Sequence, residues 1–592
     1  MINRLRIFAP PEFPVLSLEV QAHLPVVEAQ EQSQFRLLVR HFLERFFNND
    51  MVSADGETKA RLLQVVYAIA LPEIVVALYL VPMYHAPLER PFWSQVSDHY
   101  FYVLYSFVAV GAVSIFSWDL LFPDLLDLFV LSPLPIVGAR LFRSRIVAAV
   151  VFLGLFLFGS SAPGVIFYPL LSDPPGLARH LLAHVLAVLA SGAFAAALVL
   201  SLQGLMAAVM GERFSRAISP FLQGISMMLL LTIFLLFPVT SRFLDVLVNL
   251  PAARYFPPFW FLGIFETVLS GSSSQPVFSA LAKTGCLATA VAFALTIVSY
   301  PLAYRRRMRY LVEGADVFDT RNIAIVPVHR LLHATLLRNA VQRGIYHFIS
   351  CSLLRTQRHR VYMALYGGLG LALLLACTVL LKLSHRHLGF ALSPDGLLAA
   401  VPIAAFWTIA GLRTAFLSPA DRRGGWIFRL ILGRPTSVQL GATVRWILPC
   451  VLGLTLGMVA LIHRVAPPEL RGWNSLACQV LLAVGLCLLL TDALFLKVRT
   501  IPFTGETRAS ATNLAFILLQ YFGLFPPLVL LSVGLEPWLE ASVWHAVGMV
   551  VIIGAAHLAM LRTHTKDAEY HANLIDLDED EEEFPQRLGL RY

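Results

Sequence analysis

Long apolar stretches recur along the whole sequence. Each is about 20 residues long, which is the length that a helix needs to cross the hydrocarbon core of a membrane. Strands of a membrane barrel would be shorter and would alternate apolar with polar residues. We therefore expect an all-α, polytopic helical membrane protein with about 12 transmembrane helices. The stretches lie near residues 62–83, 99–117, 146–170, 181–210, 217–240, 278–303, 361–382, 395–416, 446–463, 475–496, 512–533 and 542–561.

The charged residues are few and unevenly placed. They make up 14% of the chain, against about a quarter in an ordinary soluble domain. If the stretches all cross the membrane, the loops on the side of the two termini hold 35 of the 45 lysines and arginines. The positive-inside rule then puts both termini in the cytoplasm. The net charge of +8 is accounted for by this topology, with membrane lipids as the partner, and requires no nucleic acid.

The two halves of the chain correspond in span number and in several loops. An amphipathic segment at 35–50 precedes the first span, and one at 336–360 precedes the seventh. The connections at 122–145 and 418–445 follow the second and eighth spans and share a proline-containing break. Two parallel repeats of this kind are common in transporters. We predict a cytoplasmic N-terminal segment (1–61), a six-helix unit (62–303), a cytoplasmic connection (304–360), a second six-helix unit (361–561) and a cytoplasmic acidic tail (562–592).

The connection between the second and third spans mixes acidic and apolar residues. Asp124 and Asp127 are three residues apart and would share one face of a helix, whereas Phe129 belongs to its apolar side. Pro133 and Pro135 then interrupt the helix. The pattern is typical of a helix that lies in the membrane interface. Two interpretations stay open: a simple return of the chain to the bilayer, or contact with a cytoplasmic partner.

Three charged residues fall inside the apolar stretches. Charges are costly there, so they mark functional positions or pairs between helices. Glu73 in the first span is the deepest, Arg413 lies late in the eighth span, and Asp492 lies in the tenth. Each is a candidate for lining a transport pathway or for pairing across the bundle.

Metal-binding and catalytic patterns are weak. His180 and His184, like His329 and His333, are four residues apart, but no cysteine or carboxylate follows at ligand spacing. We interpret them as ordinary histidines of the membrane interface and predict no metal site. The six cysteines are scattered without paired spacing. The glycines of 367–370 lie inside a span, where small residues allow close helix packing.

No GxxxxGK[ST] phosphate loop occurs, so any ATP hydrolysis that drives the protein must take place on another chain. The chain has no ATPase motif of its own, and its two parallel repeats favour a transport protein over an enzyme.

At these residues the chain resembles the membrane subunits, or permeases, of ATP-binding-cassette transporters of the type-2 exporter class. The amphipathic segments before each half carry the resemblance, as does LSPLPI at 131–136. The segment YFPPFWFLGIFETVLSG at 255–271 looks like the half-inserted outer segment of such permeases, through Phe256, Pro257, Pro258 and Trp260. Six spans match the family's half-transporter, so two units would form the complete membrane part.

The resemblance implies an exporter of the cytoplasmic (inner) membrane that works with a separate ATPase subunit. That partner would bind ATP, with no cofactor in this chain. In the family the connection after the second span docks on the ATPase. This role would fall to Asp124, Asp127, Phe129, Pro133 and Pro135, and in the second half to Asp421 and Arg422. The second half departs from the pattern, because Asp421-Arg422-Arg423 replaces the acidic pair and only a short outer loop, GLEPWLEA at 534–541, precedes the last span.

Two other functions fit parts of the sequence. A twelve-helix secondary carrier of the major-facilitator kind shares the six-plus-six layout, and ADRRGGW at 420–426 is similar to a loop motif of that family. The first half of this chain, however, lacks this motif. A membrane-embedded lipid-modifying enzyme would be expected to show a dense group of histidine or acidic residues at one membrane face, which the sequence does not suggest.

Overall fold

A computed structural model gives the arrangement of most of the chain. The residues that it describes are 34–46, 58–84, 90–118, 122–123, 129–131, 133–134, 136–171, 176–210, 212–312, 337, 339–384, 387–418, 437–467, 471–495, 501–504 and 511–572.

The protein is an all-α, polytopic membrane protein, as predicted. Within the described residues, 11 helices are long and apolar enough to cross a membrane. Helix α2 (Thr58–Tyr84) accounts for the first predicted span, with an apolar part at Ile69–Tyr84. The 11 helices are α3 (Phe92–Phe116), α5 (Gly138–Leu171), α6 (Leu177–Val209), α7 (Glu212–Leu235), α11 (Pro276–Val312), α14 (Gln357–Thr378), α15 (Pro394–Leu417), α17 (Ser437–Val465), α18 (Trp473–Phe495), α19 (Ala511–Glu540) and α20 (Val543–Ala572).

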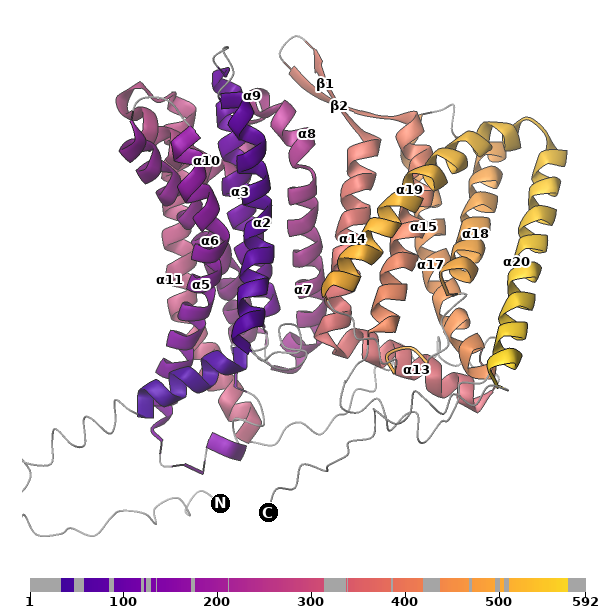
Figure 1. Cartoon of the computed structure of the whole chain (residues 1–592), viewed down its shortest axis with the longest axis horizontal. Helices are drawn as coiled ribbons and strands as arrows, with labels where there is room; N and C mark the ends of the chain where they lie inside the picture. The colour runs from indigo at the N-terminus through magenta and orange to yellow at the C-terminus, as the bar shows by residue number, and fades with distance from the viewer. Residues whose placement is uncertain are drawn as a thin grey trace, which may run out of the picture.

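The helices form two neighbouring bundles (Figure 1). Helices α2 to α11 form one bundle, which we call the first unit, and α14 to α20 form the second unit. The second span of each unit occupies its centre: α3 packs on α5, α6 and α7, and α15 packs on α17, α18 and α19. In both α3 and α15, 78% of the most apolar 18-residue stretch is buried by the rest of the protein. This repeated packing agrees with a six-plus-six plan, while the domain boundaries stay a prediction.

A helix that we call the entrance helix precedes the first span of each unit in the chain. The two entrance helices lie at the same end of the bundles (Figure 1). Residues 34–46 form the first, which buries Leu38, Phe42 and Phe46 against α5. Helix α13 (Ala340–Arg355) is the second and packs on α17. An arginine near the start of the third span bonds to a glutamine of the entrance helix in both units. Arg140 donates to Gln34, with 3.0 Å between Nη1 and Oε1, and Arg445 donates to Gln342.

A set of short helices joins α7 to α11 at the opposite end of the first unit. It comprises α8 (Phe237–Arg242), α9 (Leu244–Leu247), η2 (Pro251–Tyr255), α10 (Pro257–Ser270) and η3 (Gly271–Ser273). Proline at the start of α10 suits a position whose N–H would have no helical partner. The helix packs on α3, α6 and α11. Its half-insertion into the membrane stays a prediction.

Two loops differ from the prediction. Helix α14 ends at Thr378, so the stretch predicted to span to residue 382 continues as strand β1 (Val379–Ser384). This strand pairs antiparallel with β2 (His387–Leu392). The predicted outer loop at 534–541 is wrong, because α19 continues as a helix to Glu540. Apolar length alone does not distinguish a helix from a strand, and a proline does not always end a helix.

The two units meet where α7 packs on α14. A Cβ atom on Gly368 would lie 3.0 Å from Leu231 Cβ and 3.2 Å from the Met228 carbonyl oxygen. Thr232 also donates a hydrogen bond to the Gly368 carbonyl, with 3.3 Å between the oxygens. The helices therefore approach at a residue without a side chain. The prediction that the glycines of 367–370 serve close helix packing is confirmed.

Replacing Gly368 by leucine should force the two units apart. We expect Gly368→Leu to lower stability by about 1–3 kcal/mol, because the neighbours at this seam include backbone atoms that cannot move aside. Thermal melting in detergent measures the effect. The matched control is Gly453→Leu, at a helical glycine with open space around its Cβ position. Equal melting temperatures of the two variants would contradict the close packing of α7 on α14 at Gly368.

Candidate functional site

Glu73 lies in the interior of the first unit. Its side chain is fully buried (0% exposed), and Oε2 accepts a hydrogen bond from the Gly164 N–H of α5 at 2.8 Å. The other carboxyl oxygen, Oε1, is buried without a hydrogen-bond partner. The absence of a side chain at position 164 allows this contact, since a Cβ atom there would lie 2.9 Å from Oε2 and 2.6 Å from the Tyr102 ring.

Two histidines and two tyrosines pack together beside Glu73. The ring centroid of Tyr102 lies 5.2 Å from that of Tyr168 and 5.4 Å from that of His184. His184 in turn lies next to His99, with 3.2 Å between the two Nδ1 atoms. One of these nitrogens must carry a proton and the other accept it, so the two imidazoles differ in tautomer or charge. The cluster therefore joins α3, α5 and α6 through groups that can exchange protons.

The interpretation of His184 as an ordinary interfacial histidine is wrong. His184 is fully buried (0% exposed) and bonded to His99, and His180 beside it is also buried. His99 was not among the residues predicted from the sequence. Its place beside Asp98 at the head of an apolar run was the available indication, since polar residues in a span are seldom accidental. In the described part of the chain, no group of three or more histidine, cysteine or acidic residues could hold a metal ion.

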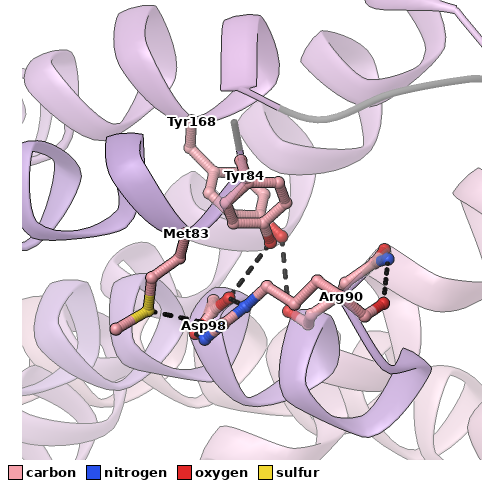
Figure 2. A network of polar contacts seen from close by, with 6 residues as sticks. Met83, Tyr84, Arg90, Asp98 and Tyr168 are labelled. Carbon is pink, nitrogen blue, oxygen red and sulfur yellow. Dashed lines mark hydrogen bonds and ion pairs between the residues drawn. The ribbon is translucent and has the colours of Figure 1, made fainter. Parts of the chain in front are cut away.

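A network of polar contacts lies at the end of the first unit where α2 is followed by α3 (Figure 2). Arg90 holds the Asp98 carboxylate with two bonds, 2.5 Å from Nε to Oδ2 and 2.7 Å from Nη2 to Oδ1. Tyr84 donates to the same carboxylate at 3.1 Å. Tyr168 of α5 donates to the Gln95 carbonyl at 3.3 Å. Asp98 raises the pKa of Arg90 above its ordinary value, chiefly through this hydrogen bond. The network fastens α2, α3 and α5 at one end.

The charged candidates of the second unit are paired. Arg413 donates to the Tyr521 hydroxyl at 3.0 Å, which joins α15 to α19. Asp492 lies 2.5 Å from Nδ1 of His557, which joins α18 to α20. The structure therefore does not bring Glu73, Arg413 and Asp492 together. Of the three, the two in the second unit have the character of bonds between helices. Among the described residues, the hydrogen-bond partner of Glu73 is the Gly164 backbone alone.

The connection between α3 and α5 is anchored on one side and exposed on the other. The Phe122 ring lies 5.3 Å from that of Tyr300 in α11, and Leu131 and Ile136 pack on the cluster formed by α5 and the helix at 34–46. Among the described residues of this connection, four apolar ones face outward, and we call them the connection surface. They are Phe129, Val130, Leu134 and Val137, which are 72%, 56%, 47% and 61% exposed.

The remaining predicted site residues divide between described and undescribed segments. Pro133 is exposed next to the connection surface. At the other end of the unit, Pro257 and Pro258 begin α10 behind Phe256, and Trp260 donates from Nε1 to the Arg254 carbonyl at 2.8 Å. Asp124, Asp127, Pro135, Asp421 and Arg422 lie outside the described residues.

Comparison with protein-family models, with curated proteins and with solved structures gives no match to this chain.

The bond between Arg90 and Asp98 should contribute measurably to stability. Their side chains are 21% and 10% exposed. Removing the charge with Asp98→Asn leaves Arg90 without its counter-charge in a largely buried place, so we expect a loss of about 2 kcal/mol. Thermal melting of the purified protein measures this. Glu44→Gln is the control, because it breaks the exposed Arg40–Glu44 pair and should leave melting unchanged. A network of no importance would give two variants with the same melting temperature.

Proposed function

We propose that this chain is the membrane-spanning subunit of an ATP-driven transporter, an exporter that works with a separate ATPase subunit. It would lie in the cytoplasmic membrane with both termini in the cytoplasm. The observation that carries the proposal is the connection surface, an outward-facing apolar patch on a segment that is fastened to the helices behind it.

The position of the connection argues that lipid does not cover it. Helix α11 has 37 residues and is about 55 Å long, whereas the hydrocarbon core is about 30 Å thick. Tyr300, on which the connection packs, lies about 36 Å from the first residue of α11. If α11 begins at the opposite membrane boundary, the connection lies at or beyond the boundary on its own side. Exposed apolar residues in such a place are typical of a protein docking site.

The contacts of the connection give a route for force from a partner to the helices. Phe122 stacks on Tyr300 of α11, and Arg307 of the same helix donates to the Pro123 carbonyl at 3.4 Å. A partner that moves the connection would move α5 and α11 with it. Since α11 carries α10 at its far end, the same motion would reach the opposite side of the membrane. Cargo would then pass between the two units by alternating access.

A secondary carrier is the second candidate function. Glu73 favours it, because a buried carboxyl group is a usual site for proton coupling in carriers. The connection surface favours the ATP-driven transporter, since a carrier needs no cytoplasmic partner. A lipid-modifying enzyme would need reactive groups at one membrane face. The described polar residues at the end of the first unit, Arg90, Asp98 and Tyr84, are instead bonded to one another.

Placing charges on the connection surface should abolish partner binding. We expect an ATP-hydrolysing subunit to co-purify with the wild-type protein from its native membrane, and Phe129→Glu/Val130→Glu to lower its yield by about tenfold or more. Tyr255→Glu is the matched control, because Tyr255 is 86% exposed in η2, at the opposite end of the unit.

The measurement is the ATPase activity of the purified fraction at equal yield of folded protein. Loss of activity in the double variant alone supports the proposal. Wild-type protein without any ATPase, under conditions that preserve membrane complexes, would exclude it in favour of the carrier.

A further inference from the structure

We propose that the first unit binds a proton at Glu73 and exchanges it with the end of the bundle where α2 passes to α3, through Tyr102, His184 and His99. We call these four residues the relay. The inference goes beyond the transport function proposed above, because no step of it depends on an ATPase or on the identity of the cargo.

The surroundings of Glu73 suit a carboxyl group that carries a proton. The group is fully buried, and its Oε1 atom has no hydrogen-bond partner. A buried carboxylate with one backbone donor is costly, whereas a carboxylic acid needs no counter-charge. The Gly164 N–H satisfies Oε2 in either state. The free oxygen is the atom at which a proton would be gained or lost.

The described neighbours of Glu73 supply no positive charge. From α3, Tyr102 and Tyr105 face it, and Tyr105 is committed to the Ile69 carbonyl of α2. From α5, the neighbour is the Gly164 backbone. The only described ion pair nearby is that of Arg90 with Asp98, in which the two charges already neutralise one another. Within the described residues a proton is therefore the available counter-charge.

The relay has a second property that simple packing does not require. Its polar atoms are buried without partners at several points: the Tyr102 hydroxyl, Nε2 of His184, and Nε2 of His99. Buried polar atoms are normally hydrogen-bonded, so several unpaired ones in a single cluster call for an explanation. Tyr168 differs, because its hydroxyl donates to the Gln95 carbonyl and is committed to the network of Figure 2. Of the two tyrosines, Tyr102 therefore has the hydroxyl that is free to take part in the proposed path.

The proton steps balance without any oxidant or further reactant. His99 takes a proton at Nε2 and releases one from Nδ1 to Nδ1 of His184, across 3.2 Å. In the proposed path, side-chain rotation then brings Nε2 of His184 to the Tyr102 hydroxyl and that hydroxyl to Oε1 of Glu73, since none of these three atoms has a hydrogen-bond partner among the described residues. His184 gives a proton to the Tyr102 oxygen, and the hydroxyl gives its own proton to Oε1. Each relay group ends neutral and the Glu73 carboxylate becomes a carboxylic acid. Release of the proton from Glu73 along the same path in the reverse direction restores the starting tautomers of the two histidines.

The binding site is tested by infrared difference spectra of the protein in lipid, recorded between about pH 5 and about pH 9. We expect a carboxylic-acid carbonyl band that disappears at high pH. It should be missing in Glu73→Gln and retained in Glu266→Gln, which alters another buried carboxyl group of the same unit. A band that persists in Glu73→Gln would overturn the proposal.

A second measurement needs no variant and so does not depend on folding. Dicyclohexylcarbodiimide reacts with protonated carboxyl groups in apolar surroundings, and mass spectrometry locates the adduct. We expect modification of Glu73 in the wild-type protein, falling as the pH rises. Absence of an adduct on Glu73 at every pH would count against a proton there.

The path is tested by the rate at which the Glu73 band responds to a pH jump. Tyr102→Phe keeps the ring but removes the hydroxyl, and should slow the response by about tenfold or more. Tyr100→Phe is the matched control, since Tyr100 is an equally buried tyrosine of α3 that packs on Phe237 and Phe259, away from the relay. Equal rates in the two variants would exclude Tyr102 from the path. These outcomes are independent of whether an ATPase binds the connection surface.

Discussion

The hydrocarbon core of a membrane offers no water to polar groups, and the architecture of this protein follows from that constraint. Backbone N–H and C=O groups must be satisfied within the chain, which helices achieve locally. The apolar side chains then gain little by leaving lipid, so packing and a few polar contacts hold the helices together. Gly164, Gly192 and Gly368 each allow a neighbouring helix to approach so closely that a Cβ atom would collide with it.

The two units share a plan but use it differently. Each has an entrance helix bonded to its third span, and each buries its second span at the centre. In the second unit the charged residues inside the helices are paired with a side chain of another helix, as Asp492 is with His557. In the first unit, the described hydrogen-bond partner of Glu73 is a backbone N–H, and α10 adds a further layer over α3 and α6. The first unit therefore has the features expected of a functional site. The paired charges of the second unit instead have the character of structural bonds between helices.

The connection surface and the proposed proton relay lie on different parts of the first unit and are connected by the same helices. Helix α5 receives the connection at its start and carries Gly164 and Tyr168 near its end. A movement of α5 would change the contact between Gly164 and Glu73, and with it the environment of the carboxyl group. The structure thus offers a physical path by which events at the two sites would influence one another.

The sequence by itself determined the class of the protein, the approximate position of each span and the role of the glycines of 367–370. These depend on apolar length and residue size, which can be read locally. Tertiary structure alone decided which polar residues meet. His99 and His184 are 85 residues apart in the sequence, and Arg413 and Tyr521 are 108 residues apart. The residues around each of them do not indicate which distant residue it will contact. It also decided that α14 ends in a hairpin, because an apolar run beyond Thr378 suits a strand as well as a helix.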